Sequence, residues 1–263
     1  MENPEKKSQP GQEAPGIAGS YWADKGEPKE KFDVIFGERK VEVKNFSDNP
    51  FTEARLIELR RVISDFCKIE NGVVFDKIKS IFIDNVQPID PETGEAINGT
   101  SVEKGDGTIK LYPNVLLEGR FHRVSGVSGF DGALLHEFTH ALANSEIFDA
   151  WVRKFGWTFN SEKIQKVRDL GLLEALRTTP QKDWANLHPE IWKLVRYWEI
   201  DNSERCVTDY AKLGPEDDLA ESMVAALRVP EVLDPERLKF LKEKFLGSAE
   251  KAEAPAVEIK RAT

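Results

Sequence analysis

The segment LLHEFTHAL, residues 134–142, constrains the fold of this chain more than any other feature. It places His136 and His140 four residues apart, with Glu137 directly after the first histidine. On a helix, side chains at i and i+4 project from one face, so both imidazoles can bind the same metal ion. Glu137 lies about 100° further round the helix axis, where it can accept a proton from a water on that metal. The segment therefore predicts a helix that carries a catalytic metal site.

The alternative is that both histidines flank an amphipathic helix and simply contact water. Two of the four histidines of the chain fall within this motif, beside an acid at the required offset, and this favours the metal site. The other two, His122 and His188, have no ligand-type partner at helical spacing. We therefore expect His122 and His188 to be ordinary surface or loop histidines.

Hydrophobic periodicity predicts the elements that come before the metal helix. Apolar residues recur at helical spacing over 52–68, which indicates an amphipathic helix. Two short runs of β-branched and aromatic residues follow, at 80–86 and 107–113, and predict strands. A stretch rich in turn residues separates the two runs.

The second half of the chain is predicted to be mostly helical. The metal helix is expected to start at Asp131, a suitable N-cap after the glycine-rich SGVSG. Another helix follows Pro189 and is expected to reach Trp198. Two more begin at Pro215 and near Pro235, because proline is tolerated in a first helical turn. Strands followed by helices favour an α+β fold over an alternating α/β one.

Composition divides the chain into one domain and two ends. Residues 1–30 are rich in Pro, Gly, Glu and Lys, so we expect a flexible N-terminal arm, and 248–263 are expected to be a flexible tail. The domain is then 31–247, with no internal repeat. Cys67 and Cys206 are too few for a disulfide scaffold, and the sequence leaves open whether they pair.

Charge and hydropathy exclude several classes of function. The 46 acidic and 37 basic residues give a net charge of -9, which argues against binding nucleic acid or anionic lipid. No apolar run is long enough to cross a bilayer, so no membrane association is expected. The first residues lack the pattern of a Sec signal peptide, so we expect a cytoplasmic protein or one exported without such a signal. Oligomeric state is not predicted.

A zinc site of this type needs a third protein ligand, and the best candidates lie in VTDYAKLGPEDDLAESM, residues 207–223. Glu216, Asp217 and Asp218 open a predicted helix, where acids also complement the helix dipole. That effect does not account for Glu221. Asp217 and Glu221 are i and i+4 and share a face, which can point into a cleft or into solvent.

Two motifs together resemble a known family. HEFTH at 136–140 and DYAKLGPEDDLAES at 209–222 are similar to zinc-dependent metallopeptidases of the zincin type, most closely those related to the catalytic domain of anthrax lethal factor. The similarity covers about residues 75–245. It implies a zincin-like domain in which a small mixed sheet and an HExxH helix precede a mostly helical C-terminal part. By position it implies zinc ligands His136, His140 and Asp217, the general base Glu137, the oxyanion donor Tyr210, and Glu221 as support for a ligand histidine.

The chain departs from the family pattern at Asp217, where the family usually has Glu. Aspartate binds metals, but its shorter side chain requires the late helix to approach the metal about 1.5 Å more closely. Glu216 or Glu221 as the third ligand, or a weakened site, are therefore alternatives. We favour Asp217 because this choice leaves Glu221 one turn away to orient a histidine. Tyr210 also has an alternative role, as a packing residue.

The resemblance implies a zinc metallopeptidase acting on a peptide or protein, and more often an endopeptidase than an exopeptidase. The alternatives are an inactive peptidase-like module that binds zinc and a protein partner, and a structural domain in which HExxH is accidental. A peptide can add to the strand before the metal helix, although an ordinary edge strand protected by Lys110 fits the same residues. Three tryptophans either line a pocket or pack in the core: Trp184, Trp192 and Trp198. The expected substrate-binding strand comprises Thr108, Ile109, Lys110, Leu111 and Tyr112.

Overall fold

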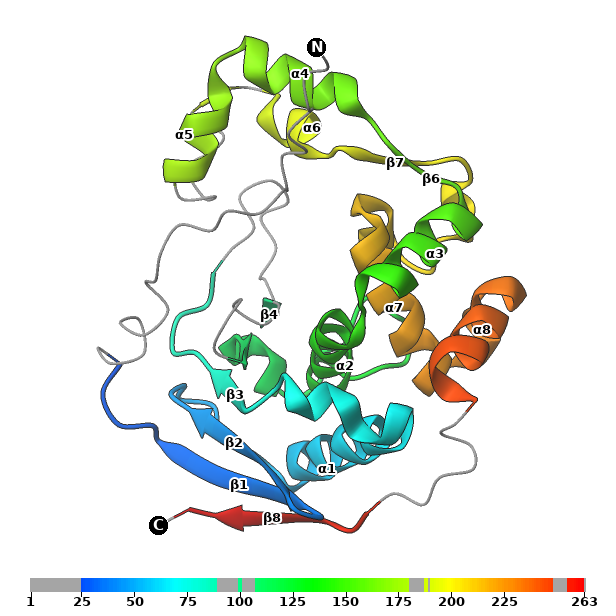
Figure 1. The fold of residues 1–263 in the computed structure, drawn as a ribbon. Helices are drawn as coiled ribbons and strands as arrows, with labels where there is room; N and C mark the ends of the chain where they lie inside the picture. Colours follow the sequence, from blue (N-terminus) through cyan, green and yellow to red (C-terminus); the bar gives the residue numbers. More distant parts are fainter. Residues whose placement is uncertain are drawn as a thin grey trace, which may run out of the picture.

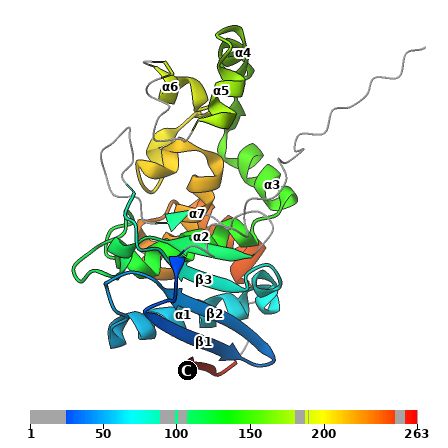
Figure 2. The same ribbon diagram turned by 90° about the vertical axis from the view of Figure 1, so that its left-hand side faces the viewer.

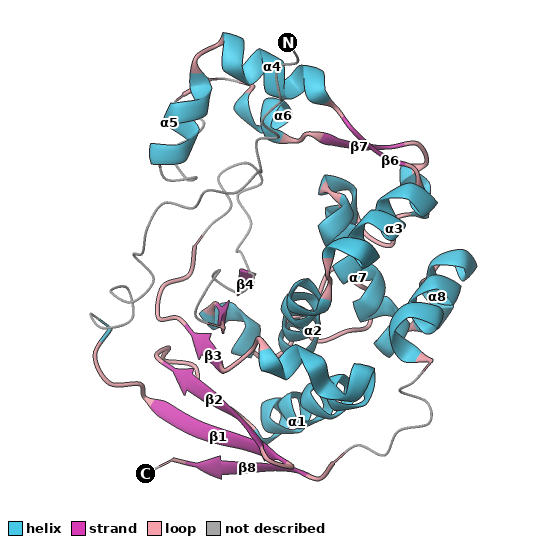
Figure 3. Cartoon of the chain, viewed as in Figure 1, coloured by secondary structure: helices cyan, strands magenta, loops and turns pink. Residues whose placement is uncertain are grey.

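A mixed sheet and the helices packed against it form a fold of the α+β class, as the sequence predicts (Figures 1 and 3). The computed structural model describes residues 25–88, 99–100, 107–179, 187–188, 190–247 and 255–262. Within them the large sheet has six strands in the order β4-β5-β3-β2-β1-β8. Strands β2, β3 and β5 are parallel, whereas β1, β4 and β8 are antiparallel to their neighbours. The six strands are β1 (Glu30–Phe36), β2 (Arg39–Asn45), β3 (Ser80–Ile83), β4 (Gly99–Thr100), β5 (Thr108–Leu111) and β8 (Val257–Arg261).

The β1–β2 hairpin shows why one face of the sheet carries the core. Val34 and Val41 are directly opposite each other and fully buried. On the other face, Asp33 and Lys40 form an ion pair of 2.9 Å in contact with solvent. This alternation is that of an antiparallel hairpin with one wet face. The sequence analysis did not predict this hairpin, although its alternation was available.

The C-terminal tail expectation is wrong for its last part. Val257–Arg261 forms β8, which pairs with β1 at the edge of the sheet (Figure 1). Residues 257–261 carry no strong strand signal in their own sequence. They form a strand because they pair with β1, which lies at the other end of the chain. Residues 248–254 of the expected tail lie outside the described residues.

The N-terminal arm expectation is also wrong where the structure describes it. Residues 1–24 lie outside the described residues, but Lys25 forms an ion pair with Asp84. The backbone N–H of Lys29 donates to the carbonyl of Asn45, 2.7 Å away, and extends the β1–β2 ladder. The sheet therefore begins inside the stretch that composition assigned to the arm.

Helix boundaries follow the sequence signals closely, with two differences. The metal helix α2 (Gly129–Leu142) is capped by Ser128, whose hydroxyl accepts from the N–H of Asp131, so Asp131 is not the N-cap. The helix after Pro189 ends early, and Trp198 lies in a strand instead. The strands expected at 80–86 and 107–113 each have only 4 residues, Ser80–Ile83 and Thr108–Leu111, and are shorter than predicted. As predicted, the chain forms α1 (Glu53–Lys68), α6 (Ile191–Val195), α7 (Pro215–Arg228) and α8 (Pro235–Leu241).

A lobe of short elements lies at the end of the molecule away from β8 (Figures 1 and 2). The lobe contains β6 (Trp157–Phe159), α4 (Ser161–Asp169), α5 (Leu172–Thr178), α6 and β7 (Trp198–Ile200), and α3 (Ser145–Phe155) leads into it.

Two further expectations concern the cysteines and the membrane. Cys67 and Cys206 are both free thiols. Among the helices that the structure describes, none is long and apolar enough to cross a membrane.

Helices α2 and α7 pack side by side and antiparallel, and this pairing builds the site. At one end, Arg228 of α7 binds the buried carboxylate of Asp131 through two nitrogens, at 2.6 and 3.1 Å. Such a bidentate pair fixes orientation as well as distance. The register that it sets places the middle of α7 against the HExxH turns of α2.

Candidate metal centre

Three ligand-type atoms converge where α2 meets α7. The Nε2 atoms of His136 and His140 lie 2.9 Å apart. Asp217 Oδ1 lies 3.6 Å from the first and 3.8 Å from the second. Zinc bonds of about 2.05 Å in tetrahedral geometry require ligand atoms about 3.3 Å apart. The three side chains therefore have the chemistry and the spacing to hold one divalent ion.

The pKa values of the two histidines show that this point favours a positive charge. Burial opposes protonation of His136, but its contacts with Asp217 and Glu221 outweigh burial and raise its pKa to about 10. Burial, together with the charge on His136, lowers the pKa of His140 to about 4. The pair thus accommodates one positive charge among nearby carboxylates, which is the electrostatic requirement of a cation site.

Glu221 orients His136 toward this point. Glu221 Oε1 lies 2.9 Å from Nδ1 of His136, and its carboxylate is fully buried. A carboxylate accepts hydrogen bonds, so Nδ1 of His136 keeps its proton, and a metal that displaces the proton from Nε2 would bind at that nitrogen. Because both Glu221 oxygens are engaged, Oε2 by the Thr208 hydroxyl at 3.0 Å, Glu221 is a poorer candidate for the third ligand than Asp217.

Glu137 is buried beside the three ligand atoms. Its side chain has an oxygen, Oε2, with no hydrogen-bond partner among the described residues. Burial, followed by the negative charges of Asp217 and Glu221, raises the pKa of Glu137 to about 7, although His136 acts in the opposite direction. A carboxylate with that pKa and an unused oxygen is suited to accept a proton near neutral pH.

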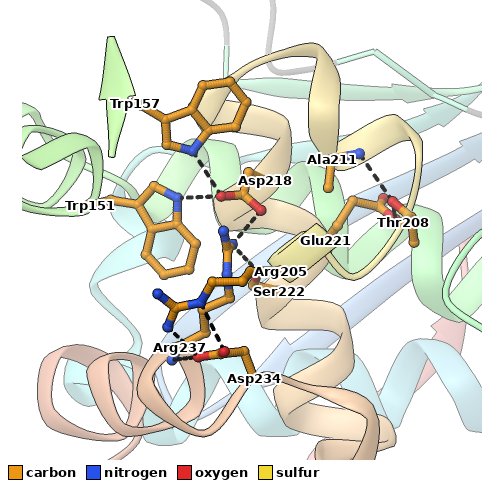
Figure 4. Close-up of polar contacts among 10 residues, drawn as sticks. All are labelled: Trp151, Trp157, Arg205, Thr208, Ala211, Asp218, Glu221, Ser222, Asp234 and Arg237. Atoms are coloured by element: carbon orange, nitrogen blue, oxygen red, sulfur yellow. Dashed lines mark hydrogen bonds and ion pairs between the residues drawn. The ribbon is translucent and has the colours of Figure 1, made fainter. Parts of the chain in front are cut away.

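Tyr210 lies next to the ring of His136. Their ring centroids are 5.8 Å apart, and the Arg123 guanidinium lies 3.9 Å above the Tyr210 ring. Tyr210 opens the short helix η6 (Tyr210–Leu213), in which the N–H of Ala211 donates to the hydroxyl of Thr208. Since the same hydroxyl donates to Glu221, Thr208 connects the start of η6 to the carboxylate of Glu221 (Figure 4).

Asp218 follows Asp217 in sequence but faces the opposite side of α7. It is fully buried, and its Oδ2 accepts from the indole nitrogens of Trp151 and Trp157, each 3.0 Å away (Figure 4). Its Oδ1 pairs with the buried guanidinium of Arg237. This network belongs to α3, β6 and α8, so Asp218 is not available to the metal centre. It fixes the rotation of α7 that directs Asp217 toward α2.

The expectation for His122 is wrong. We expected an ordinary surface or loop histidine, but its side chain is only 2% exposed and its Nε2 lies 3.4 Å from Glu221 Oε1. His122, His136 and Glu221 form a second group of atoms close enough to hold a metal ion. Gly132, the fourth residue of α2, makes room for this ring, since a Cβ there would lie 2.2 Å from Cγ of His122, but a glycine near a helix start is too common a signal to predict the contact. His188, by contrast, is half-buried and apart from these groups.

The predicted substrate strand is not at the edge of the sheet. The strand β5 is buried throughout, and β4 pairs with it opposite Lys110 and Leu111. Lys110 also forms a buried ion pair of 2.9 Å with Asp84. The signal for an edge strand failed because β4, only two residues long, carries no pattern of its own. The other residues of the predicted strand, Thr108, Ile109 and Tyr112, are likewise buried.

Among the described residues, no tryptophan of the expected three lines a pocket at this site. Trp184 and the side chain of Trp192 lie outside the described residues. Trp198 is half-buried and packs edge-on against Phe148 and Phe159. Its role is therefore in packing the base of the lobe.

Comparison with known proteins gives no family for the chain. No family model, no curated protein and no solved structure matches it. Any function for this site therefore has to be argued from its own residues.

Proposed function

We propose that the chain is a zinc-dependent metallopeptidase. The observation that carries this proposal is the convergence of His136, His140 and Asp217 on one point, with the buried oxygen of Glu137 unpartnered beside it. The alternatives for the third ligand are weaker, since Glu221 supports His136 and the exposed Glu216 belongs to neither group of ligand-type atoms among the described residues. Asp217 reaches the point despite its short side chain, so its departure from the family pattern gives no support to an inactive module.

His136, His140 and Asp217 would hold the metal. When bound, zinc supplies a Lewis acid that polarises a carbonyl and lowers the pKa of water. The two ligand histidines come from a single helical turn, and α7 brings the third ligand against them. This leaves the fourth direction for water and substrate, as catalytic zinc sites require.

Glu137 acts as the general base in this proposal. It accepts the proton of the attacking water on its unpartnered oxygen and later passes it to the nitrogen of the departing amine. Its raised pKa favours both transfers, because a carboxyl group near pH 7 gains and loses a proton readily. Burial also keeps Glu137 from competing hydrogen bonds.

Tyr210 stabilises the negative charge that develops on the carbonyl oxygen. Burial raises the pKa of Tyr210, so its hydroxyl stays protonated and able to donate. The stacked Arg123 holds the ring in place, since a cation over an aromatic face is attracted to it. A peptide that adds to the sheet would pair with β4, because β5 is already paired on that side.

The deciding experiment is the substitution Glu137→Gln. We expect it to retain zinc and the fold, and to lower the hydrolysis of unfolded casein by about 10²–10⁴-fold, as expected for loss of a general base. The matched control is Glu146→Gln, which changes an exposed acid of α3 in the same way. Wild-type hydrolysis in Glu137→Gln would refute the mechanism. Wild-type protein that takes up zinc and cleaves no peptide bond would refute the proposed activity.

A further inference from the structure

His122 is held in one orientation by its own loop. Its backbone N–H donates to the carbonyl of Val127, 2.8 Å away, and its side-chain Nδ1 accepts from the N–H of Val124 at 3.2 Å. An imidazole that accepts at Nδ1 carries its proton on Nε2 when it is neutral. The Nε2–H group therefore faces Glu221.

Three groups surround the carboxylate of Glu221. Oε1 lies 2.9 Å from Nδ1 of His136 and 3.4 Å from Nε2 of His122, and Oε2 accepts from Thr208 at 3.0 Å. A buried carboxylate that is contacted from three sides has one orientation. That orientation determines which way the His136 ring faces.

Gly132 makes room for the His122 ring. It lies on α2 one turn before His136, and an added Cβ would come within 2.6 Å of three atoms of the His122 side chain. Gly132 is the fourth residue of α2, and the absence of a side chain there leaves the space that the His122 ring occupies.

We propose that His122 is a positioning residue of the metal centre, which steadies Glu221 and, through it, the metal-facing orientation of His136. This inference rests on the proposed metal site but not on peptide hydrolysis. His122 is not itself assigned to the metal, because its Nδ1 is engaged by the backbone and its Nε2 faces the carboxylate. Partners beyond the ligands commonly determine metal affinity in this way.

The first test compares two substitutions of similar bulk in the full chain. His122→Phe fills the space without a donor, whereas His122→Gln places an amide N–H near the position of Nε2. We expect His122→Phe to weaken zinc binding by about 10-fold or more, and His122→Gln to restore most of the affinity. Zinc affinity is measured by competition with a chromophoric chelator, and the melting temperature of the metal-free protein reports on the fold.

The second test is a double-mutant cycle with Gly132→Ala. In the wild-type background the added methyl group displaces the His122 ring, so zinc affinity should fall. In the His122→Gly background neither the ring nor the Cβ of residue 122 is present, so the same change should leave the zinc affinity of that variant unaltered. This non-additivity keeps the test valid even if His122→Phe proves too unstable to purify.

The outcomes separate this inference from the proposed function. Equal zinc affinity for wild type, His122→Phe and His122→Gln would overturn the inference, even if the wild type cleaves peptides. Equal loss in His122→Phe and His122→Gln would also overturn it, because the donor would then be irrelevant. Retained zinc binding without hydrolysis in the wild type would refute only the peptidase activity.

Discussion

The Nε2 atoms of His136 and His140 face each other at 2.9 Å, with Asp217 Oδ1 within 4 Å of both. Two imidazole lone pairs at this distance repel each other unless a proton or a metal ion lies between them. A bound metal replaces the proton, relieves this repulsion and joins α2 to α7. Metal binding should therefore contribute directly to the stability of the fold.

Removal of metal should lower the melting temperature. Zinc that binds only the folded chain stabilises it by about 2.7 kcal/mol when free zinc exceeds Kd about 100-fold. We expect a chelator to remove this gain and added zinc to restore it, as followed by circular dichroism during heating. His136→Ala should melt at the same temperature with and without zinc. A zinc-dependent shift in that variant would place the metal elsewhere.

Asp217→Ala should weaken zinc binding far more than Glu216→Ala. Asp217 supplies an oxygen within 4 Å of the Nε2 atoms of both ligand histidines, whereas the exposed Glu216 forms no part of either metal-binding group. Competition titrations on the two purified variants make the comparison. The reverse ranking would reassign the third ligand.

Asp218→Ala should destabilise the protein by about 3–5 kcal/mol, because it leaves the buried guanidinium of Arg237 without its partner. Two indole N–H groups lose their acceptor as well. The control is Asp209→Ala, which removes an exposed ion pair with Lys212 and should have little effect on stability, because solvent screens such pairs. Urea unfolding measures both. Similar losses in the two variants would contradict the structural role of the Asp218 network.

Tyr210→Phe should lower kcat by about 10²–10³-fold, since it removes one donor to the oxyanion. Zinc affinity should not change, because the Tyr210 hydroxyl contacts no ligand atom in the structure. Tyr197→Phe, in the lobe, is the matched control and should leave kcat unchanged. If Tyr210→Phe is as active as wild type, Tyr210 is a packing residue.

In the metal-free protein, the contribution of Glu137 to stability should fall as pH rises from 4.5 to 7. Burial raises the pKa of Glu137 from its usual 4.5 to about 7, so in this window the folded state holds a proton that the unfolded chain has released. The part of the free energy of unfolding that depends on Glu137 then falls as pH rises, whereas the lowered pKa values of His122 and His140 act in the opposite direction in both the wild type and the variant. Glu137→Gln cannot titrate, so its stability relative to wild type should increase across the window. Urea unfolding in chelator measures this difference, and a constant difference would contradict the raised pKa.

The helices whose signals lie within a few residues of each other in the sequence were predicted correctly. The helix over 53–68 was expected because its apolar residues recur with helical period, and Thr52 caps it. The helix α7 begins at Pro215 as expected, since proline suits a first turn. The strand β8 was not predicted because it depends on a partner far away in the chain, whereas β1 and β2 were not predicted although their alternation of apolar and polar residues is a local signal.

The sequence by itself determined which chemistry was available: two histidines one helical turn apart, a glutamate between them, and an acidic helix later in the chain. Helical geometry is a local property, so spacing alone sufficed for this part. The tertiary structure decided which acid meets the histidines, that Asp131 binds Arg228, and that His122 lies against Glu221. Those contacts join residues from separate elements, and they depend on the packing register of α2 and α7, which no local pattern encodes.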